Sequence, residues 1–244
     1  MPQTNNRSKS PIMIDPKIKT IAFDADDTLW VNETIFDATQ ERFFKLLEQY
    51  VPEEVLRKHL FQTEIKNLKY FGYGVKGFIL SMIETAVELT EGLVRGGDIQ
   101  QIIDWGREMI EHPVENIEGV EQALKTLSQH YQLMVITKGD LLDQESKLAR
   151  SGLADYFDKV EIVSDKTAAQ YQEILNRHDI KAEEFLMIGN SLKSDVLPVL
   201  EIGGQAVHIP FSSTWEHETV APAEENHHQI VAFASVTEFV KTIG

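Results

Sequence analysis

Three aspartates lie within four positions at the end of an apolar run, in the stretch IAFDADDTLW at residues 21–30. At this spacing the carboxylates of Asp24, Asp26 and Asp27 repel one another, and the repulsion grows where water is scarce. The three charges therefore do not help the fold, and they point to a function that requires them. We expect a cation beside them, supplied by a basic side chain, a metal ion or both.

Polar stretches follow three further apolar runs in the same manner. They are TKGD at 137–140, SDKT at 164–167 and GNSLKSD at 189–195. Any one of them is typical of a turn or a helix N-terminus. In an open parallel sheet, however, ligands bind beyond the carboxyl ends of the strands. Four such stretches, one with three aspartates and one with Lys166, predict a single polar site at that edge.

The elements that must position these residues are short buried strands. Five apolar runs fit a parallel sheet: KIKTIAF at 17–23, YQLMVIT at 131–137, VEIVS at 160–164, FLMIG at 185–189 and QAVHI at 205–209. Helical patterns over 119–130, 167–178 and 194–203 lie beside them in the chain. Strands that alternate with helices at this spacing predict the α/β class, with a Rossmann-like, doubly wound parallel sheet.

More than 100 residues separate the first predicted strand from the second, and this insert is helical in pattern. Apolar residues recur at helical spacing over 33–50, 52–65, 75–89 and 99–110. We therefore predict an inserted all-α helical-bundle cap over 32–112. The Rossmann-like core then comprises 17–31 and 113–244, and residues 1–16 form a flexible N-terminal tail.

The composition limits the partners and the compartment. The 244 residues carry 23 Lys and Arg against 39 Asp and Glu, a formal charge of −16, which disfavours nucleic acid and anionic membranes as partners. There are no cysteines, which excludes disulfides and thiolate metal sites. No run is long enough to span a bilayer, and the polar N-terminus does not resemble a signal peptide. We expect a soluble cytoplasmic protein, a monomer or a homodimer, that acts on a small molecule.

The ordered set DADDT, TKG, Lys166 and GNSLKSD resembles the four motifs of the haloacid dehalogenase superfamily, most of whose members are Mg²⁺-dependent phosphatases. The predicted helical insert lies where that superfamily places its cap, between the first and second motifs, so the resemblance covers nearly the whole chain. It implies hydrolysis of a small phosphorylated metabolite, such as a sugar phosphate or a nucleotide-like compound, through an aspartyl-phosphate intermediate.

The resemblance also assigns roles to the aspartates of the first motif. Asp24 is the position of the nucleophile, since a carboxylate can attack phosphorus. Asp26 is the position of the general acid and base, which protonates the departing alkoxide. True dehalogenases of the superfamily lack an aspartate there, so Asp26 favours a phosphatase. Asp27 fills a place held by residues that tolerate a positive φ, and we expect it to shape the backbone.

Phosphoryl transfer requires cations around the phosphate. By resemblance the residues that bind the phosphoryl oxygens are Thr28, Thr137, Lys138, Gly139 and Lys166. Thr137 and the backbone amides of the following turn would bind them as a helix N-terminus binds an anion. The residues that would hold Mg²⁺ are Asp24, the backbone carbonyl of Asp26, Asn190 and Asp195.

The fourth motif departs from the pattern of the superfamily. It usually reads Gly-Asp-Ser with a second Asp further on, whereas this chain has Gly189, Asn190 and Ser191, followed by Asp195. The amide oxygen of Asn190 can coordinate Mg²⁺ but adds no negative charge. We expect weaker metal binding unless Asp195 is the main ligand.

The substrate is read least directly from the sequence. The stretch YFGYGVKGF at 70–78 predicts a cap loop that reaches into the site, with Tyr73 and Lys76 on the part of the substrate that is not phosphate. Three alternatives to a phosphatase stay open: a phosphomutase with the same motifs, a metal-independent 2-haloacid dehalogenase, and a non-catalytic binding protein of the same fold.

Overall fold

The core of the protein is a six-stranded sheet in which every strand is parallel to its neighbours. In the computed structural model, which describes residues 15–213, 215–220 and 231–242, the strand order is β3-β2-β1-β4-β5-β6. The strands are β1 (Thr20–Phe23), β2 (Gln132–Lys138), β3 (Lys159–Val163), β4 (Phe185–Gly189), β5 (Gln205–His208) and β6 (Val231–Ala232). The order changes direction between β1 and β4, which is where ligands bind in such sheets.

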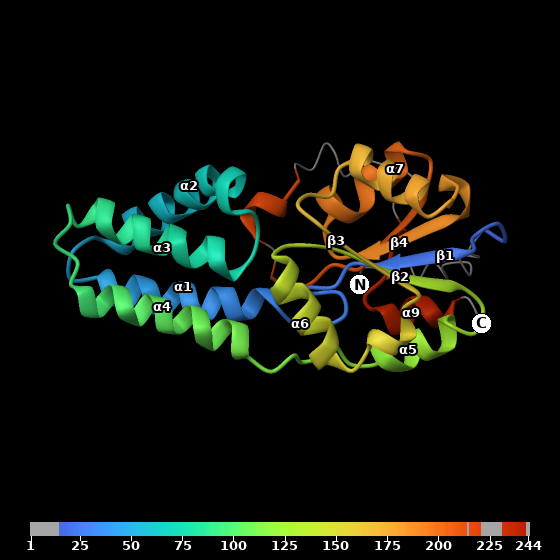
Figure 1. Cartoon of the computed structure of the whole chain (residues 1–244), viewed down its shortest axis with the longest axis horizontal. Helices are drawn as coiled ribbons and strands as arrows, with labels where there is room; N and C mark the ends of the chain where they lie inside the picture. The colour runs from blue at the N-terminus through green and yellow to red at the C-terminus, as the bar shows by residue number, and fades with distance from the viewer. Residues whose placement is uncertain (1–14, 214, 221–230, 243–244) are drawn as a thin grey trace, which may run out of the picture.

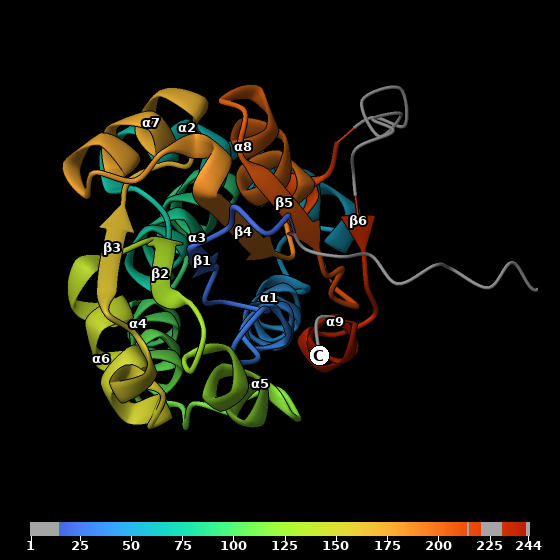
Figure 2. The ribbon, with the colours of Figure 1, turned by 90° about the vertical axis from the view of Figure 1, so that its right-hand side faces the viewer.

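Helices cover both faces of the sheet, as Figures 1 and 2 show. On one face lie α7 (Ala168–Arg177) and α8 (Leu197–Glu201), and on the other lie α5 (Val120–Leu127), α6 (Leu141–Ser151) and α9 (Val236–Lys241). Successive residues of β1 alternate between the two cores, because Ile21 and Phe23 pack with α5 and α9 while Ala22 packs with α7 and α8. The prediction of a Rossmann-like doubly wound sheet is confirmed.

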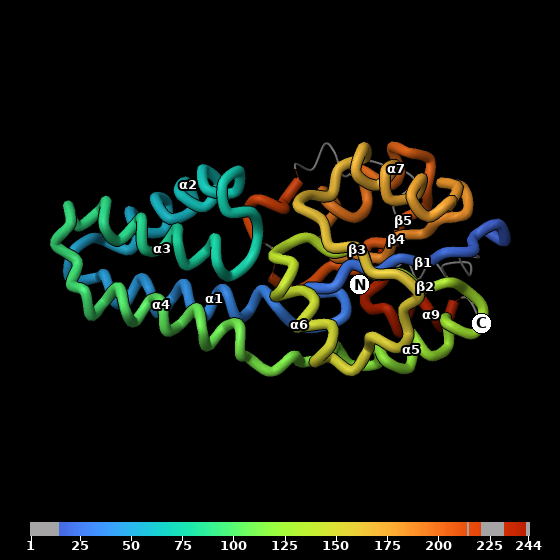
Figure 3. The backbone as a smooth tube through the Cα atoms, viewed as in Figure 1, coloured from blue at the N-terminus to red at the C-terminus, as the bar shows by residue number. Residues whose placement is uncertain are grey.

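Four helices from one continuous insert extend from the end of the sheet where the strands terminate. They are α1 (Glu33–Leu47), α2 (Glu53–Phe71), α3 (Val75–Leu89) and α4 (Gly96–Glu111), and they run side by side in Figure 3. Their buried apolar side chains, among them Phe43, Met82 and Trp105, form a core separate from those of the sheet. Within the described residues, no helix is both long and apolar enough to span a bilayer.

Three elements were not predicted, namely β6, α6 and α9, and several predicted ones differ at their ends. The predicted strand at 17–23 begins only at Thr20. The loop predicted at 70–78 is shorter than expected, because α2 continues to Phe71 and α3 begins at Val75, which leaves only residues 72–74 between them. Gly72 and Gly74 both adopt positive φ, 69° and 108°, so two glycines suffice for this sharp turn. Of the predicted tail, residues 1–14 lie outside the described part of the chain.

Candidate active site

The centre of the site is a buried lysine between two buried aspartates. Lys166, which follows β3, is 4% exposed, and its ammonium donates hydrogen bonds to Asp24 and to Oδ1 of Asp195, the latter at 2.6 Å. Burial alone would lower the pKa of Lys166, but the two carboxylates raise it above the ordinary lysine value. The sequence predicted a basic side chain beside the aspartates, and Lys166 occupies that position.

Asp24 follows β1 directly and lines a cavity between the sheet and the helical bundle. Burial raises its pKa to about 7, although Lys166 acts in the opposite direction and Asp195 adds to the increase. The hydroxyl of Thr28 lies 3.3 Å from Oδ2 of Asp24 and 3.5 Å from Oδ1 of Asn190. Thr28 therefore contacts the predicted nucleophile and a predicted metal ligand at once.

Asp26 lies at the same cavity but has different partners. The indole N–H of Trp30 donates to Oδ1 at 2.7 Å, and the amide of Gln144 donates to Oδ2 at 2.9 Å. The ammonium of Lys147 lies 3.0 Å from Oδ1 and 3.2 Å from Oδ2. None of these three partners was singled out in the sequence. Gln144 and Lys147 are three residues apart on α6, and that spacing puts both on one helical face.

Asp27 adopts a φ of 61°, so the predicted positive φ is confirmed. Its carboxylate has a second role that the sequence did not reveal. It accepts hydrogen bonds from the backbone N–H groups of Asn32, at 2.8 Å, and of Glu33, at 3.0 and 3.1 Å, at the start of α1. Burial raises the pKa of Asp27 to about 6 despite these bonds. Asp27 thus fixes the first helix of the insert to the loop after β1.

The second motif holds its side chains at the end of β2. Thr137 donates to Oε1 of Gln144 at 3.1 Å, and the ammonium of Lys138 donates to Ser194 at 2.9 Å. The backbone N–H of Gly139 donates to the carbonyl of Val163 at 3.2 Å, so this amide does not face the cavity as an anion donor, contrary to the prediction. Thr137 and Lys138 do line the cavity.

The fourth motif forms a turn of π-helix, Leu192–Val196, shortly after β4. Asp195 lies inside it, 1% exposed, and its Oδ2 accepts the backbone N–H of Ser191 at 3.0 Å. A Cβ on Gly189 would lie 2.3 Å from Cγ of Asp195, which explains the glycine at this position. Both carboxylate oxygens of Asp195 are therefore engaged, one by Lys166 and one by Ser191.

The oxygen atoms of the predicted metal ligands suit a hard cation such as Mg²⁺, but few of them carry a negative charge. Among the residues that the structure describes, no group of three or more His, Asp or Glu side chains is placed to hold a metal. Asp24 and Asn190 both offer side-chain oxygens beside the Thr28 hydroxyl, and Mg²⁺ commonly uses one or two carboxylates together with substrate phosphate. Asp24 already accepts hydrogen bonds from Lys166 and Thr28, and Asp195 from Lys166 and Ser191, so a cation at either carboxylate would replace one of these bonds.

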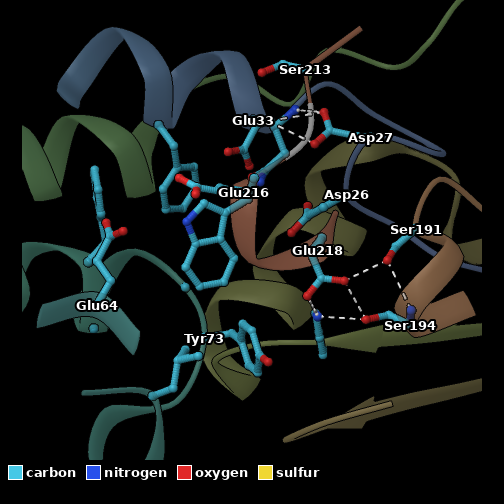
Figure 4. A pocket seen from close by; sticks show the side chains of 18 of the residues that line it. Asp26, Asp27, Glu33, Glu64, Tyr73, Ser191, Ser194, Ser213, Glu216 and Glu218 are labelled. Atoms are coloured by element: carbon cyan, nitrogen blue, oxygen red, sulfur yellow. Dashed lines mark hydrogen bonds and ion pairs between the residues drawn. The ribbon is translucent and has the colours of Figure 1, made fainter. Parts of the chain in front are cut away.

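A largely buried glutamate that the sequence did not indicate joins the second and fourth motifs. Glu218, after β5, accepts hydrogen bonds from the hydroxyls of Ser191 and Ser194, both at 2.6 Å, and pairs with Lys138 (Figure 4). Burial alone would raise the pKa of Glu218, but Lys138 and the two hydroxyls lower it to about 2. A lone glutamate in a polar stretch gives no sequence signal for such a contact.

The same segment, residues 213 and 215–218, reaches across to the helical bundle. Ser213 donates to Asp37 of α1 at 2.7 Å, and Trp215 bonds to Glu64 of α2. The ring of Trp215 also meets the ring of Tyr73 edge-on, with centroids 6.1 Å apart. We call these residues the β5–β6 segment. It closes one side of the cavity, and no residue of it was predicted to be functional.

The cavity has a volume of about 580 Å³ and is bounded by the sheet, the bundle and the β5–β6 segment. Tyr73 lines it as predicted, with the ammonium of Lys138 4.2 Å from its ring centre. Lys76 is not among the lining residues; it pairs with Asp140 at 2.9 Å on the outside of the molecule. Burial raises the pKa of Glu33 to about 8 and of Glu64 to about 7 on the bundle side.

The family model of haloacid dehalogenase-like hydrolases matches residues 18–203. A curated relative, the glyceraldehyde 3-phosphate phosphatase of Methanothermobacter thermautotrophicus, is 27% identical over 78% of this chain and 84% of its own.

Solved structures of haloacid dehalogenase-like proteins are also similar to this chain. A haloacid dehalogenase-like hydrolase from Xanthomonas campestris is 39% identical, with a TM-score of 0.83 over 94% of this chain and 92% of its own. The L-2-haloacid dehalogenase from Xanthobacter autotrophicus has a TM-score of 0.62 at 16% identity, over 92% of this chain and 97% of its own, and this likeness concerns the fold alone.

Proposed function

Because the chain belongs to the haloacid dehalogenase-like hydrolases, we propose that it is a Mg²⁺-dependent phosphatase acting on a small phosphorylated metabolite. The observation that carries this proposal is the pairing of Asp24 with Lys166 at a cavity that Asp26 also lines. The phosphatase activity of the curated relative supports the reaction class.

In this proposal the carboxylate of Asp24 attacks the phosphorus, and the ester oxygen departs with a proton from Asp26. Water then attacks the aspartyl-phosphate, and Asp26 takes its proton. Lys166 holds Asp24 in place and offers positive charge to the phosphoryl oxygens. A divalent cation held by Asp24, the carbonyl of Asp26 and Asn190 would neutralise phosphate charge there.

The wall of the cavity favours a leaving group without a further anionic group. Acidic side chains outnumber basic ones along it, and Lys138, Lys147 and Lys166 are each already paired with carboxylates. A sugar phosphate, whose leaving group carries hydroxyls, fits such a wall better than a compound with a second phosphate or a carboxylate.

The test is phosphate release from a panel of phosphomonoesters, with Mg²⁺ and with a chelator. We expect release that requires Mg²⁺ and is fastest on substrates with a neutral, hydroxyl-bearing leaving group.

One observation favours a second candidate, because Asn190 stands where phosphatases of the superfamily carry an aspartate and dehalogenases also carry an asparagine nearby. Chloride release from 2-chloropropionate without metal would replace the phosphatase proposal with a dehalogenase. Transfer of a labelled phosphoryl group back to the substrate, with little free phosphate, would indicate a phosphomutase.

A further inference from the structure

Lys147 is a largely buried cation that none of the four motifs includes. Its side chain is 12% exposed and extends from the middle of α6 towards the loop after β1. The ammonium lies 3.0 and 3.2 Å from the two carboxylate oxygens of Asp26 and 2.7 Å from Oδ1 of Asn32. It also lies 3.7 Å from Asp143, one helical turn earlier. Removing an ammonium group from water carries a desolvation penalty, and ion pairs and hydrogen bonds offset only part of it.

We propose that Lys147, together with Gln144, is a positioning residue that holds the carboxylate of Asp26 in the orientation needed for proton transfer. This inference rests on the proposed function, since it concerns the general acid and base of that reaction. The four motifs include only Asp26 for this proton transfer. The inference adds Gln144 and Lys147 of α6 as the residues that orient it.

The geometry fixes the carboxylate of Asp26 from three sides. Trp30 and Lys147 both donate to Oδ1, while Gln144 and Lys147 both donate to Oδ2. A carboxylate held at both oxygens cannot rotate about its last bond without breaking charge-assisted hydrogen bonds. Its side chain is 23% exposed, so without these donors water and other rotamers would compete.

Gln144 is itself oriented from the second motif. Its Oε1 accepts the hydroxyl of Thr137 at 3.1 Å, which turns its NH₂ group towards Asp26. A chain of hydrogen bonds therefore runs from Thr137 through Gln144 to Asp26. The start of α6 supports this arrangement, because Asp140 caps the helix by accepting the backbone N–H of Asp143 at 3.1 Å.

The test uses leaving-group dependence, because proton donation matters most when the departing oxygen is strongly basic. We expect Lys147→Met to lower kcat/KM by roughly tenfold or more on an alkyl phosphate and by less than about threefold on p-nitrophenyl phosphate. Lys147→Arg should restore most of the alkyl activity, since a cation of similar reach returns. Gln144→Met should also lower kcat/KM more on the alkyl phosphate than on p-nitrophenyl phosphate, but by a smaller factor than Lys147→Met.

Matched controls separate positioning from stability. Lys66→Met removes a lysine that also lies near two carboxylates, Glu84 and Glu88, but on the outer side of the bundle, and it should leave both substrates unchanged. Thermal unfolding reports folding of every variant. If Lys147→Met does not fold, the Gln144→Met and Lys147→Arg variants decide the question.

Equal losses on alkyl and aryl substrates for the folded variants would overturn the inference while leaving the phosphatase proposal intact. If the wild-type protein releases phosphate from no ester in the panel, the proposed function itself fails, and the inference fails with it.

Discussion

The two sides of the cavity are built from different kinds of element: strand ends form the sheet side, whereas helices and a distant core segment form the bundle side. On the sheet side, Asp24, Asp26, Thr137, Lys166 and Asp195 all lie at the ends of neighbouring strands, as predicted. On the bundle side, the predicted contact Lys76 points away, and residues from a distant segment take part instead. Strand ends are placed by the pairing of a parallel sheet, whereas the bundle wall depends on how separate units meet.

The β5–β6 segment makes this difference concrete. Trp215 and Glu218 belong to the core by sequence, yet Trp215 bonds to Glu64 of α2 while Glu218 bonds to the second and fourth motifs. This part of the cavity wall is therefore built jointly by the bundle and by a core loop. We therefore propose that this segment contacts the substrate together with the inserted helices.

The largest expected effect tests the sheet side. Asp24→Asn should abolish turnover, with residual activity below about one per cent of wild type, because an amide cannot form the aspartyl-phosphate. The unfolding temperature should stay the same or rise slightly, since a charge that repels Asp195 is removed. Phosphate release and thermal unfolding measured on the same preparation check both parts. Appreciable activity in the variant would remove Asp24 from the role of nucleophile.

The next prediction compares the two candidate contacts of the bundle side. Trp215→Ala should lower kcat/KM for the best metabolite by roughly tenfold, because an aromatic wall and its bond to Glu64 are lost, with little effect on a small generic ester. Lys76→Ala should change either value by less than about threefold, since its ammonium forms an exposed pair with Asp140. Steady-state kinetics on both substrates decide. The reverse order of effects would restore Lys76 as the specificity residue.

A smaller effect is expected at the fourth motif. Asn190→Asp adds a charge beside Asp24, so the Mg²⁺ concentration for half-maximal activity should fall severalfold at low ionic strength. At saturating metal, kcat/KM need not rise, because the added carboxylate also repels phosphate. A Mg²⁺ titration of activity for both proteins measures the shift. Identical midpoints would place residue 190 outside the metal site.

A substitution of Glu64 is expected to affect activity least. This residue therefore tests the bundle side of the cavity through the stability of the protein. Burial raises its pKa to about 7, from an ordinary value of 4.5. The folded protein then binds this proton more tightly than the unfolded chain, so the stabilising contribution of Glu64 is present below about pH 4.5 and is lost as the pH rises towards 7.

Glu64→Gln should therefore stabilise the protein relative to wild type by roughly 1 to 3 kcal/mol at pH 8, and much less at pH 5. Chemical unfolding at the two values measures the difference, with the exposed Glu53→Gln on the same helix as control. A gain that does not depend on pH would show that Glu64 is not a strained buried carboxylate.

The sequence by itself determined the sheet, its helical insert and the residues at its strand ends. The apolar runs and the spacing of strands and helices are local properties, and parallel pairing then brings Asp24, Lys166 and Asp195 together. The positive φ of Asp27 was also readable, because few residue types adopt it.

Only the tertiary structure decided the partners of these residues. The hydrogen bonds from Lys147 and Gln144 to Asp26 depend on where α6 packs relative to the loop after β1, and the contacts of Glu218 depend on a loop folding back over the strand ends. A lone lysine on a helix, or a glutamate in a polar loop, has the same local pattern whether it faces solvent or a buried carboxylate. The role of each is fixed by side chains distant in the sequence, since Asp26 is 121 positions from Lys147 and Lys138 is 80 positions from Glu218, and local residue spacing carries no record of them.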